Sequence, residues 1–71
     1  MATNINLETG GSVWKMYVKP GDTVAEGQEL FIMEVMKMEV PYEAPAAGTI
    51  SAVHIAEGDV VEEGQLAVEI T

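Results

Sequence analysis

An internal repeat constrains this chain more than any other feature. Residues 11–28 align with residues 48–65 at an offset of 37, and seven of the eighteen aligned positions are identical. The first residues of each half also match, 2–7 with 39–44. The fold must therefore be one that two similar half-units build together. The identical pairs are Gly11/Gly48, Gly21/Gly58, Asp22/Asp59, Val24/Val61, Glu26/Glu63, Gly27/Gly64 and Gln28/Gln65.

The repeat predicts a two-fold arrangement. Two similar halves in one small domain are expected to lie around an approximate two-fold axis. The joint between them, near Met36 and Lys37, is then expected at one end of the molecule, with the two termini together at the other. Beyond the aligned segment we expect the second half to lack one residue relative to the first, which aligns Leu30 with Leu66 and Ile32 with Val68.

Each half has the pattern of short strands. Leu66, Val68 and Ile70 occupy alternate positions, which is the period-2 pattern of a half-buried strand. No segment shows a convincing helical period. The same alternation is expected in residues 13–18, with Trp14, Met16 and Val18 on one face and Val13, Lys15 and Tyr17 on the other.

Matched turn sequences separate the strands. Pro20-Gly21-Asp22 and Glu57-Gly58-Asp59 place glycine where a positive φ angle is expected, and aspartate where it can bond nearby backbone. A second matched pair of glycine turns covers residues 26–28 and 63–65, and residues 45–48 form a further turn. Strands are expected at residues 3–7, 12–19, 23–25, 29–35, 38–44, 49–55, 60–62 and 66–70.

These patterns predict an all-β fold. About eight short strands are expected to form two four-stranded antiparallel sheets packed face to face, a flattened barrel or sandwich with internal two-fold symmetry. A length of 71 residues suits one small domain, so we assign residues 1–71 to a single unit.

Charge and composition exclude several classes of function. The chain has twelve acidic and three basic residues, which gives a net charge of −9. This charge disfavours binding to nucleic acid and to anionic membranes and favours binding to basic protein surfaces. The plainer alternative is that the charge keeps a small protein soluble. The absence of cysteine excludes disulfides and thiolate chemistry. Because apolar runs are short and no secretory signal pattern is present, we expect no membrane span and a cytoplasmic or organelle-matrix location.

The segment that joins the halves departs from the turn chemistry of the rest of the chain. The strands expected at 29–35 and 38–44 must meet in a two-residue hairpin at Met36 and Lys37, although such turns favour Asn-Gly or Gly-X. Left-handed conformations cost residues of this kind roughly 1 kcal/mol or more each. Departures of this kind are expected at functional sites. We therefore expect Lys37 to project into solvent; a solubilising role for it, and core filling by Met36 and Met38, are the plainer alternatives.

The run Val35-Met36-Lys37-Met38-Glu39 resembles the attachment signature of biotinyl domains, the swinging-arm carriers of biotin-dependent carboxylases. Their usual signature is Ala-Met-Lys-Met, with the lysine amide-linked to biotin. The resemblance covers nearly the whole chain, including residues 18–28 in the first half and 44–66 in the second. The second strand runs directly into the first glycine turn, so the chain resembles the compact members of the family that lack an inserted "thumb".

The resemblance implies roles for five residues around the hairpin. Lys37 is the expected site of covalent biotin, attached by a biotin–protein ligase. Met36 and Met38 are expected to contact the ligase or the carboxylase sites. Val35 replaces the usual alanine, a mild departure that bears on the speed of attachment. Glu34 occupies a position where an acid is usual and is expected to contact the ligase; the alternative is an ordinary solvated strand charge.

The resemblance also implies a carrier rather than an enzyme. Biotin would carry a carboxyl group from a biotin carboxylase to a carboxyltransferase, which passes it to an acyl-CoA, as in fatty acid biosynthesis, or to a keto acid. We expect a monomer with no catalytic residue and no metal site. The single histidine, His54, has the pattern of a partly exposed strand residue, and Glu26, Asp59, Glu62 and Glu63 that of turn and surface charges.

Two other functions stay open from the sequence. Lipoyl domains of 2-oxo acid dehydrogenase complexes share the expected fold, but their lysine typically follows an aspartate, whereas Met36 precedes Lys37 here. An unmodified interaction module on the same fold is the second alternative. The chain is either a free-standing carrier or a domain of a larger carboxylase, and the acceptor substrate is a property of the carboxyltransferase.

Overall fold

The computed structural model describes residues 2–71 and contains eight β-strands. In that part of the chain we find no helix long and apolar enough to cross a membrane. The strands begin and end within two residues of the sequence-based expectations, except that β2 ends three residues earlier than expected. They are β1 (Thr3–Asn6), β2 (Gly11–Met16), β3 (Thr23–Val24), β4 (Glu29–Val35), β5 (Met38–Glu43), β6 (Gly48–Val53), β7 (Val60–Val61) and β8 (Leu66–Ile70).

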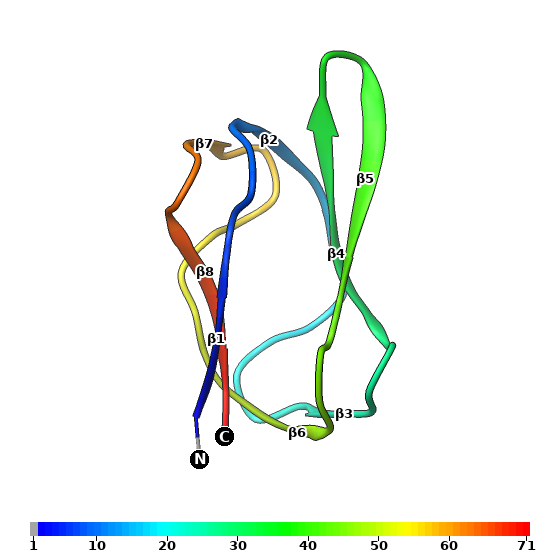
Figure 1. The fold of residues 1–71 in the computed structure, drawn as a ribbon, viewed down its shortest axis with the longest axis vertical. Coiled ribbons are helices and arrows are strands. Elements are labelled where there is room, and N and C mark those ends of the chain that lie inside the picture. The colour runs from blue at the N-terminus through cyan, green and yellow to red at the C-terminus, as the bar shows by residue number, and fades with distance from the viewer. Residues whose placement is uncertain (1) are drawn as a thin grey trace.

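The strands form two four-stranded antiparallel sheets, in the orders β1-β8-β6-β3 and β5-β4-β2-β7. Each sheet contains two strands from each half of the chain, so neither half folds as a separate layer. Figure 1 shows the β4–β5 hairpin extending from one end of the molecule and both termini at the other, where Thr3 pairs with Ile70. The expected all-β sandwich, and the expected placement of joint and termini, are confirmed.

The offset of 37 residues holds through the whole ladder. Met16 pairs with Phe31, and Val53 pairs with Val68, so both partners shift by the same amount. Leu30 is therefore equivalent to Ala67, and the expected alignment of Leu30 with Leu66 is wrong. Backbone hydrogen bonds fix the register, whereas the likeness of two leucines one position apart does not.

A β-bulge at Trp14 overturns the simple alternation expected in residues 13–18. The register of β2 against β4 shifts between Val13 and Lys15, and Trp14 and Lys15 are both exposed. Val13 and Val18 are both buried, although strict alternation would place them on opposite faces. A bulge inserts one unpaired residue and so reverses the inside–outside pattern beyond it. The same shift recurs in β6, between Ile50 and Ala52.

The glycine turns have the predicted geometry. Gly21 and Gly58 have φ angles of 96° and 89°, and Gly27 and Gly64 each have φ of 84°. In the first pair of turns, the following aspartate carboxylate accepts a hydrogen bond from the backbone N–H three residues before it. These bonds are Lys19 N–H to Asp22, at 3.1 Å, and Ala56 N–H to Asp59, at 2.9 Å.

The core holds the hairpin strands firmly. Phe31 and Met33 of β4 are fully buried, and Phe31 stacks on Tyr42 of β5 with ring centroids 4.7 Å apart. The Tyr42 hydroxyl also accepts a hydrogen bond from the Glu8 N–H, which ties β5 to the loop after β1. Burial of each large apolar side chain contributes about 1.5–3 kcal/mol. The β4–β5 hairpin therefore rises from a rigid base.

Candidate functional site

The tip of the β4–β5 hairpin consists of Met36 and Lys37. Val35 pairs with Met38 across the two strands, so only two residues make the turn. Their φ angles are 51° for Met36 and 67° for Lys37, and they are the only non-glycine residues with positive φ among residues 2–71. The expected left-handed hairpin at this joint is confirmed.

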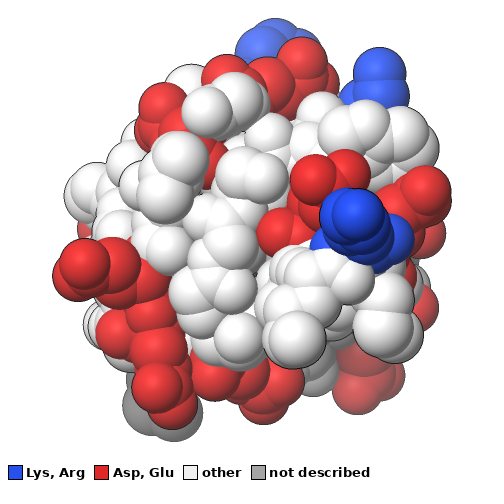
Figure 2. Space-filling view, turned by 90° about the horizontal axis from the view of Figure 1, so that it is seen from above, with Lys and Arg blue, Asp and Glu red and all other residues white. Residues whose placement is uncertain are grey.

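The side chains at the tip point into solvent. Met36 is 90% exposed and Met38 is 67% exposed, so neither fills the core. Lys37 is exposed, and the described residues offer its ammonium group no ion pair and no hydrogen bond. Figure 2 views this end of the molecule and shows a lysine standing forward among acidic and uncharged side chains. The amine is therefore accessible from solvent.

Val35 and Glu34 lie at the end of β4, directly below the tip. Val35 is half-buried and packs against the core, so its side chain supports the turn from inside. Glu34 is exposed and stands opposite Glu39 of β5. Like charges in directly opposed positions destabilise a sheet, so this pair is not explained by stability. It places two carboxylates on the strand positions next to the Val35–Met38 pair that closes the turn.

The tip presents one primary amine, that of Lys37. The described residues contain no group of three or more acidic, histidine or cysteine side chains that could hold a metal ion. His54 is exposed and contacts Glu69 at 2.7 Å, on the other sheet. Glu26, Asp59, Glu62 and Glu63 are exposed, as expected. The site can therefore offer an exposed amine as a nucleophile and as a point of attachment.

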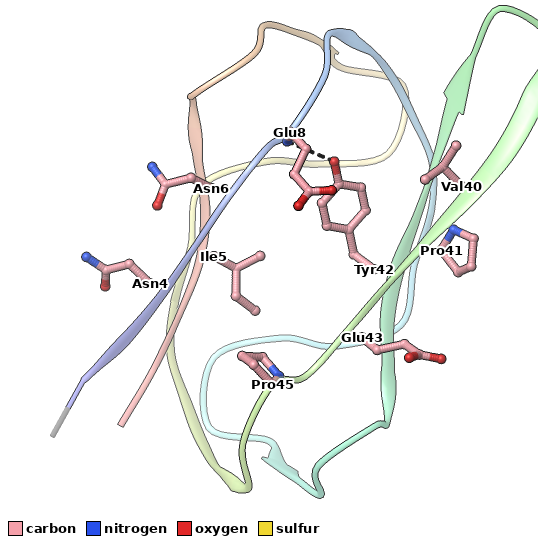
Figure 3. Close-up of a pocket in the computed structure, with 9 residues that line it drawn as sticks. All are labelled: Asn4, Ile5, Asn6, Glu8, Val40, Pro41, Tyr42, Glu43 and Pro45. Atoms are coloured by element: carbon pink, nitrogen blue, oxygen red, sulfur yellow. Dashed lines mark hydrogen bonds between the residues drawn. The ribbon is translucent and has the colours of Figure 1, made fainter.

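A groove lies between the two edge strands β1 and β5 (Figure 3). Its volume is about 410 Å³, and the Glu8–Tyr42 hydrogen bond crosses one end of it. None of residues 34–38 lines it, so it is separate from the tip. It is lined by Asn4, Ile5, Asn6, Glu8, Val40, Pro41, Tyr42, Glu43 and Pro45.

The sequence did not identify Trp14 and Tyr17 as exposed residues near the site. Both are exposed, on β2 and directly after it, in the sheet that contains the β4–β5 hairpin. The signal was present in the repeat. At the offset of 37, Trp14 aligns with Ser51 and Tyr17 with His54, so only one half carries large aromatic side chains at these positions.

Comparison with known proteins agrees with the geometry. The profile of a family described as "Biotin-requiring enzyme" matches residues 2–70. The biotin/lipoyl attachment protein of Bacillus subtilis is 40% identical over 67 residues, covering 94% of this chain and 92% of that protein. The human mitochondrial propionyl-CoA carboxylase alpha chain is 50% identical over 60 residues, but this chain covers only 8% of its length.

Solved structures show the same fold. The urea carboxylase of Kluyveromyces lactis contains a matching segment with a TM-score of 0.90 and 32% identity, covering all of this chain and 6% of that one. The lipoyl domain of the 2-oxoglutarate dehydrogenase complex from Azotobacter vinelandii gives a TM-score of 0.85 and 27% identity, covering 96% of this chain and 94% of that one. The chain belongs to the biotin/lipoyl attachment family, as a small carrier domain rather than a catalyst.

Proposed function

We propose that this protein is a biotin carboxyl carrier and that Lys37 is its biotin attachment site. The observation that carries the proposal is the geometry of the tip. Lys37 has a φ angle of 67°, lies between two exposed methionines, and has no ion pair or hydrogen-bond partner for its side chain among residues 2–71. A turn lysine that served only solubility would gain nothing from a strained Met-Lys pair. Family membership supports biotin or lipoate as the attached group, and the Met36–Lys37–Met38 sequence favours biotin.

The residues of the chain fit covalent attachment of biotin. The Lys37 ammonium group would lose a proton to a group of the biotin–protein ligase, and the free amine would attack the acyl carbon of biotinyl adenylate. The new C–N amide bond would form as the acyl–phosphate C–O bond breaks, with AMP as the leaving group and a second proton released from the amine. Met36 and Met38 would offer the ligase flexible, uncharged contacts on both sides of the amine. Glu34 would contact a basic group of the ligase, and Val35 would hold the turn above the core.

Attached biotin would supply the carboxyl-carrying chemistry that links a biotin carboxylase site to a carboxyltransferase site. The rigid sandwich would keep the tip in one shape while the arm moves. Tethering gives effective concentrations on the order of millimolar for flexible links, so the arm need not diffuse freely between sites. The acceptor, an acyl-CoA or a keto acid, would be chosen by the carboxyltransferase. We place this function in the cytoplasm, with the carrier monomeric in isolation.

Intact mass spectrometry after co-expression with a biotin–protein ligase tests the proposal. The wild-type chain should gain one biotinyl group, and Lys37→Arg, which keeps the positive charge, should gain none. A mass increase of one lipoyl group would instead indicate an acyl carrier of a 2-oxo acid dehydrogenase complex. An unmodified wild-type chain would contradict the carrier function and favour an interaction module.

A further inference from the structure

We propose that the outer face of sheet β5-β4-β2-β7 is the surface on which the biotin–protein ligase docks. This hairpin face comprises the exposed residues Trp14, Lys15, Tyr17, Pro41 and Val60; Ile32, which pairs with Lys15 and Pro41, is only 9% exposed. The inference rests on the proposed function, because it names the surface that the modifying enzyme recognises beyond the tip.

The large hydrophobic residues that are strongly exposed among residues 2–71 are confined to one sheet and the segments next to it. Among residues 2–71, five large hydrophobic side chains are strongly exposed, from 43% for Trp14 to 90% for Met36. All five lie on strands β2, β5 or β7, in the β4–β5 turn, or directly after β2. Sheet β1-β8-β6-β3 has none. The five are Trp14, Tyr17, Met36, Met38 and Val60.

The two-fold repeat provides an internal control for this asymmetry. Both sheets have the same strand order and the same bulge, so backbone geometry does not require aromatic residues on one of them. On the opposite sheet the equivalent positions are polar or small, and His54 and Glu69 bond to each other there. The equivalent pairs are Trp14/Ser51, Lys15/Ala52, Tyr17/His54, Ile32/Glu69, Pro41/Asn4 and Val60/Thr23.

The hairpin face is continuous with the tip. One row of cross-strand neighbours joins Val60, Ser12, Glu34 and Glu39, and the next row joins Lys15, Ile32 and Pro41. The bulge exposes Trp14 beside this second row, with the Lys15 Nζ atom 5.7 Å from the centre of its ring. Bulges often re-aim side chains near functional sites. A protein seated on the tip would extend over these rows.

The chemistry of the face defines its partner. Trp and Tyr are enriched at the energetic centres of protein interfaces, so the partner should offer an apolar pocket for Trp14. Because Glu34 and Glu39 are acidic and the chain has a net charge of −9, the partner should place basic groups near the tip. It should place one acidic group opposite Lys15, farther from the tip. The same charge disfavours a second copy of this chain. The ligase fits best, because it must bring the Lys37 Nζ atom itself within bonding distance of its substrate, whereas enzymes that use attached biotin act at the end of a longer arm.

Steady-state kinetics with a bacterial biotin–protein ligase, ATP and biotin tests the docking surface. The variant W14S/K15A/Y17H transfers the residues of the opposite sheet onto this one, so the same bulged backbone accommodates them. We expect its KM as a protein substrate to rise about tenfold or more, as for loss of interface anchor residues, with kcat nearly unchanged because Lys37 is untouched. The matched control S51A/H54A, on the opposite sheet, should keep the wild-type KM. Thermal melting monitored by circular dichroism checks that all three chains are folded.

A competition experiment separates docking from chemistry. Lys37→Arg should inhibit modification of the wild-type chain, and W14S/K15A/Y17H/K37R should inhibit it about tenfold less strongly. Equal KM values and equal inhibition would overturn the docking surface while leaving the carrier function intact. If the ligase leaves the wild-type chain unmodified, the proposed function fails, and this inference fails with it.

Discussion

Five turns in the described part of the chain use positive φ angles, and they fall into two kinds. Four contain glycine, at positions 21, 27, 58 and 64, and are related in pairs by the repeat. The fifth, Met36-Lys37, has no counterpart, because the equivalent place in the other half is the open end of the chain where the termini lie. Glycine adopts these angles at no steric cost, whereas Met and Lys are strained by roughly 1 kcal/mol or more each.

The molecule tolerates backbone strain at the tip and avoids it in the glycine turns. The glycine turns connect strands of the sandwich, and glycine adopts their positive φ angles without steric strain. The tip is held by the paired, core-anchored strands β4 and β5, whose Phe31 and Tyr42 rings stack. Strain persists only where the surrounding structure over-determines it. The strained turn is also the place where the chain exposes a free amine.

The largest effect is expected from moving the lysine off the strained turn. The variant Lys37→Met/Met38→Lys places the amine on the first residue of β5 and leaves composition unchanged. Biotinylation should be lost, because the amine no longer stands at the apex, while the fold is retained. Ligase assays by mass spectrometry measure the first property, and thermal melting measures the second. Attachment at position 38 would show that turn position does not matter.

The second largest effect is expected from placing a non-glycine residue at a positive φ angle in a glycine turn. Gly21→Val and Gly58→Val should each lower the free energy of unfolding by about 1–2 kcal/mol. A Cβ at either position would meet no atom within 4 Å, so the cost comes from the backbone rather than from a clash. Chemical denaturation measures it, with Thr23→Val as a control on a regular strand. A loss no larger than in the control would show that these angles are not enforced.

The reverse substitution should relieve the tip. Asn tolerates the left-handed region, so Met36→Asn should raise the free energy of unfolding by about 0.5–1 kcal/mol. Met38→Asn, at a regular strand position, serves as the control and should not stabilise the protein. Chemical denaturation again gives the values. If Met36→Asn destabilises the chain, Met36 makes contacts that outweigh its strain.

The smallest effect distinguishes two matched glycine turns. The pKa of Asp22 is lowered from its ordinary value of 3.8, first by the Lys19 backbone N–H and then by the Lys19 side chain, 3.1 Å away. The ionised form is thus favoured in the folded state. Its contribution to stability is present above pH 3.8 and is lost as pH falls through the lower folded value.

Asp22→Asn should therefore destabilise the protein slightly at neutral pH and no longer do so once Asp22 is protonated in the folded state. Urea denaturation at a series of pH values down to 2 tests this. Lys19→Ala should reduce the lowering of the Asp22 pKa, because it removes the Lys19 side chain; the equivalent residue in the matched turn is Ala56. A pH-independent cost of Asp22→Asn would contradict the assigned cause.

Much of the fold could be predicted from the sequence, because glycine turns and repeats report local backbone needs directly. The sandwich, the positions of all eight strands and the exposed tip follow from that information. The bulge at Trp14 and the unbroken offset at Leu30 did not, because pairing across strands sets both. At the site, Lys37 and its methionines stand out in sequence. The shared face formed by Trp14 and Lys15 emerges only from three-dimensional register.

Site-resolved tandem mass spectrometry tests whether the strained turn selects the modified lysine, because two other lysines of the chain serve as controls. Lys15 and Lys19 are also exposed, but they lie on a strand and in a glycine turn. After incubation with a bacterial biotin–protein ligase, ATP and biotin, we expect one biotinyl group on Lys37 and none on the other two lysines. Biotin on Lys15 or Lys19, or an unmodified Lys37, would contradict this expectation.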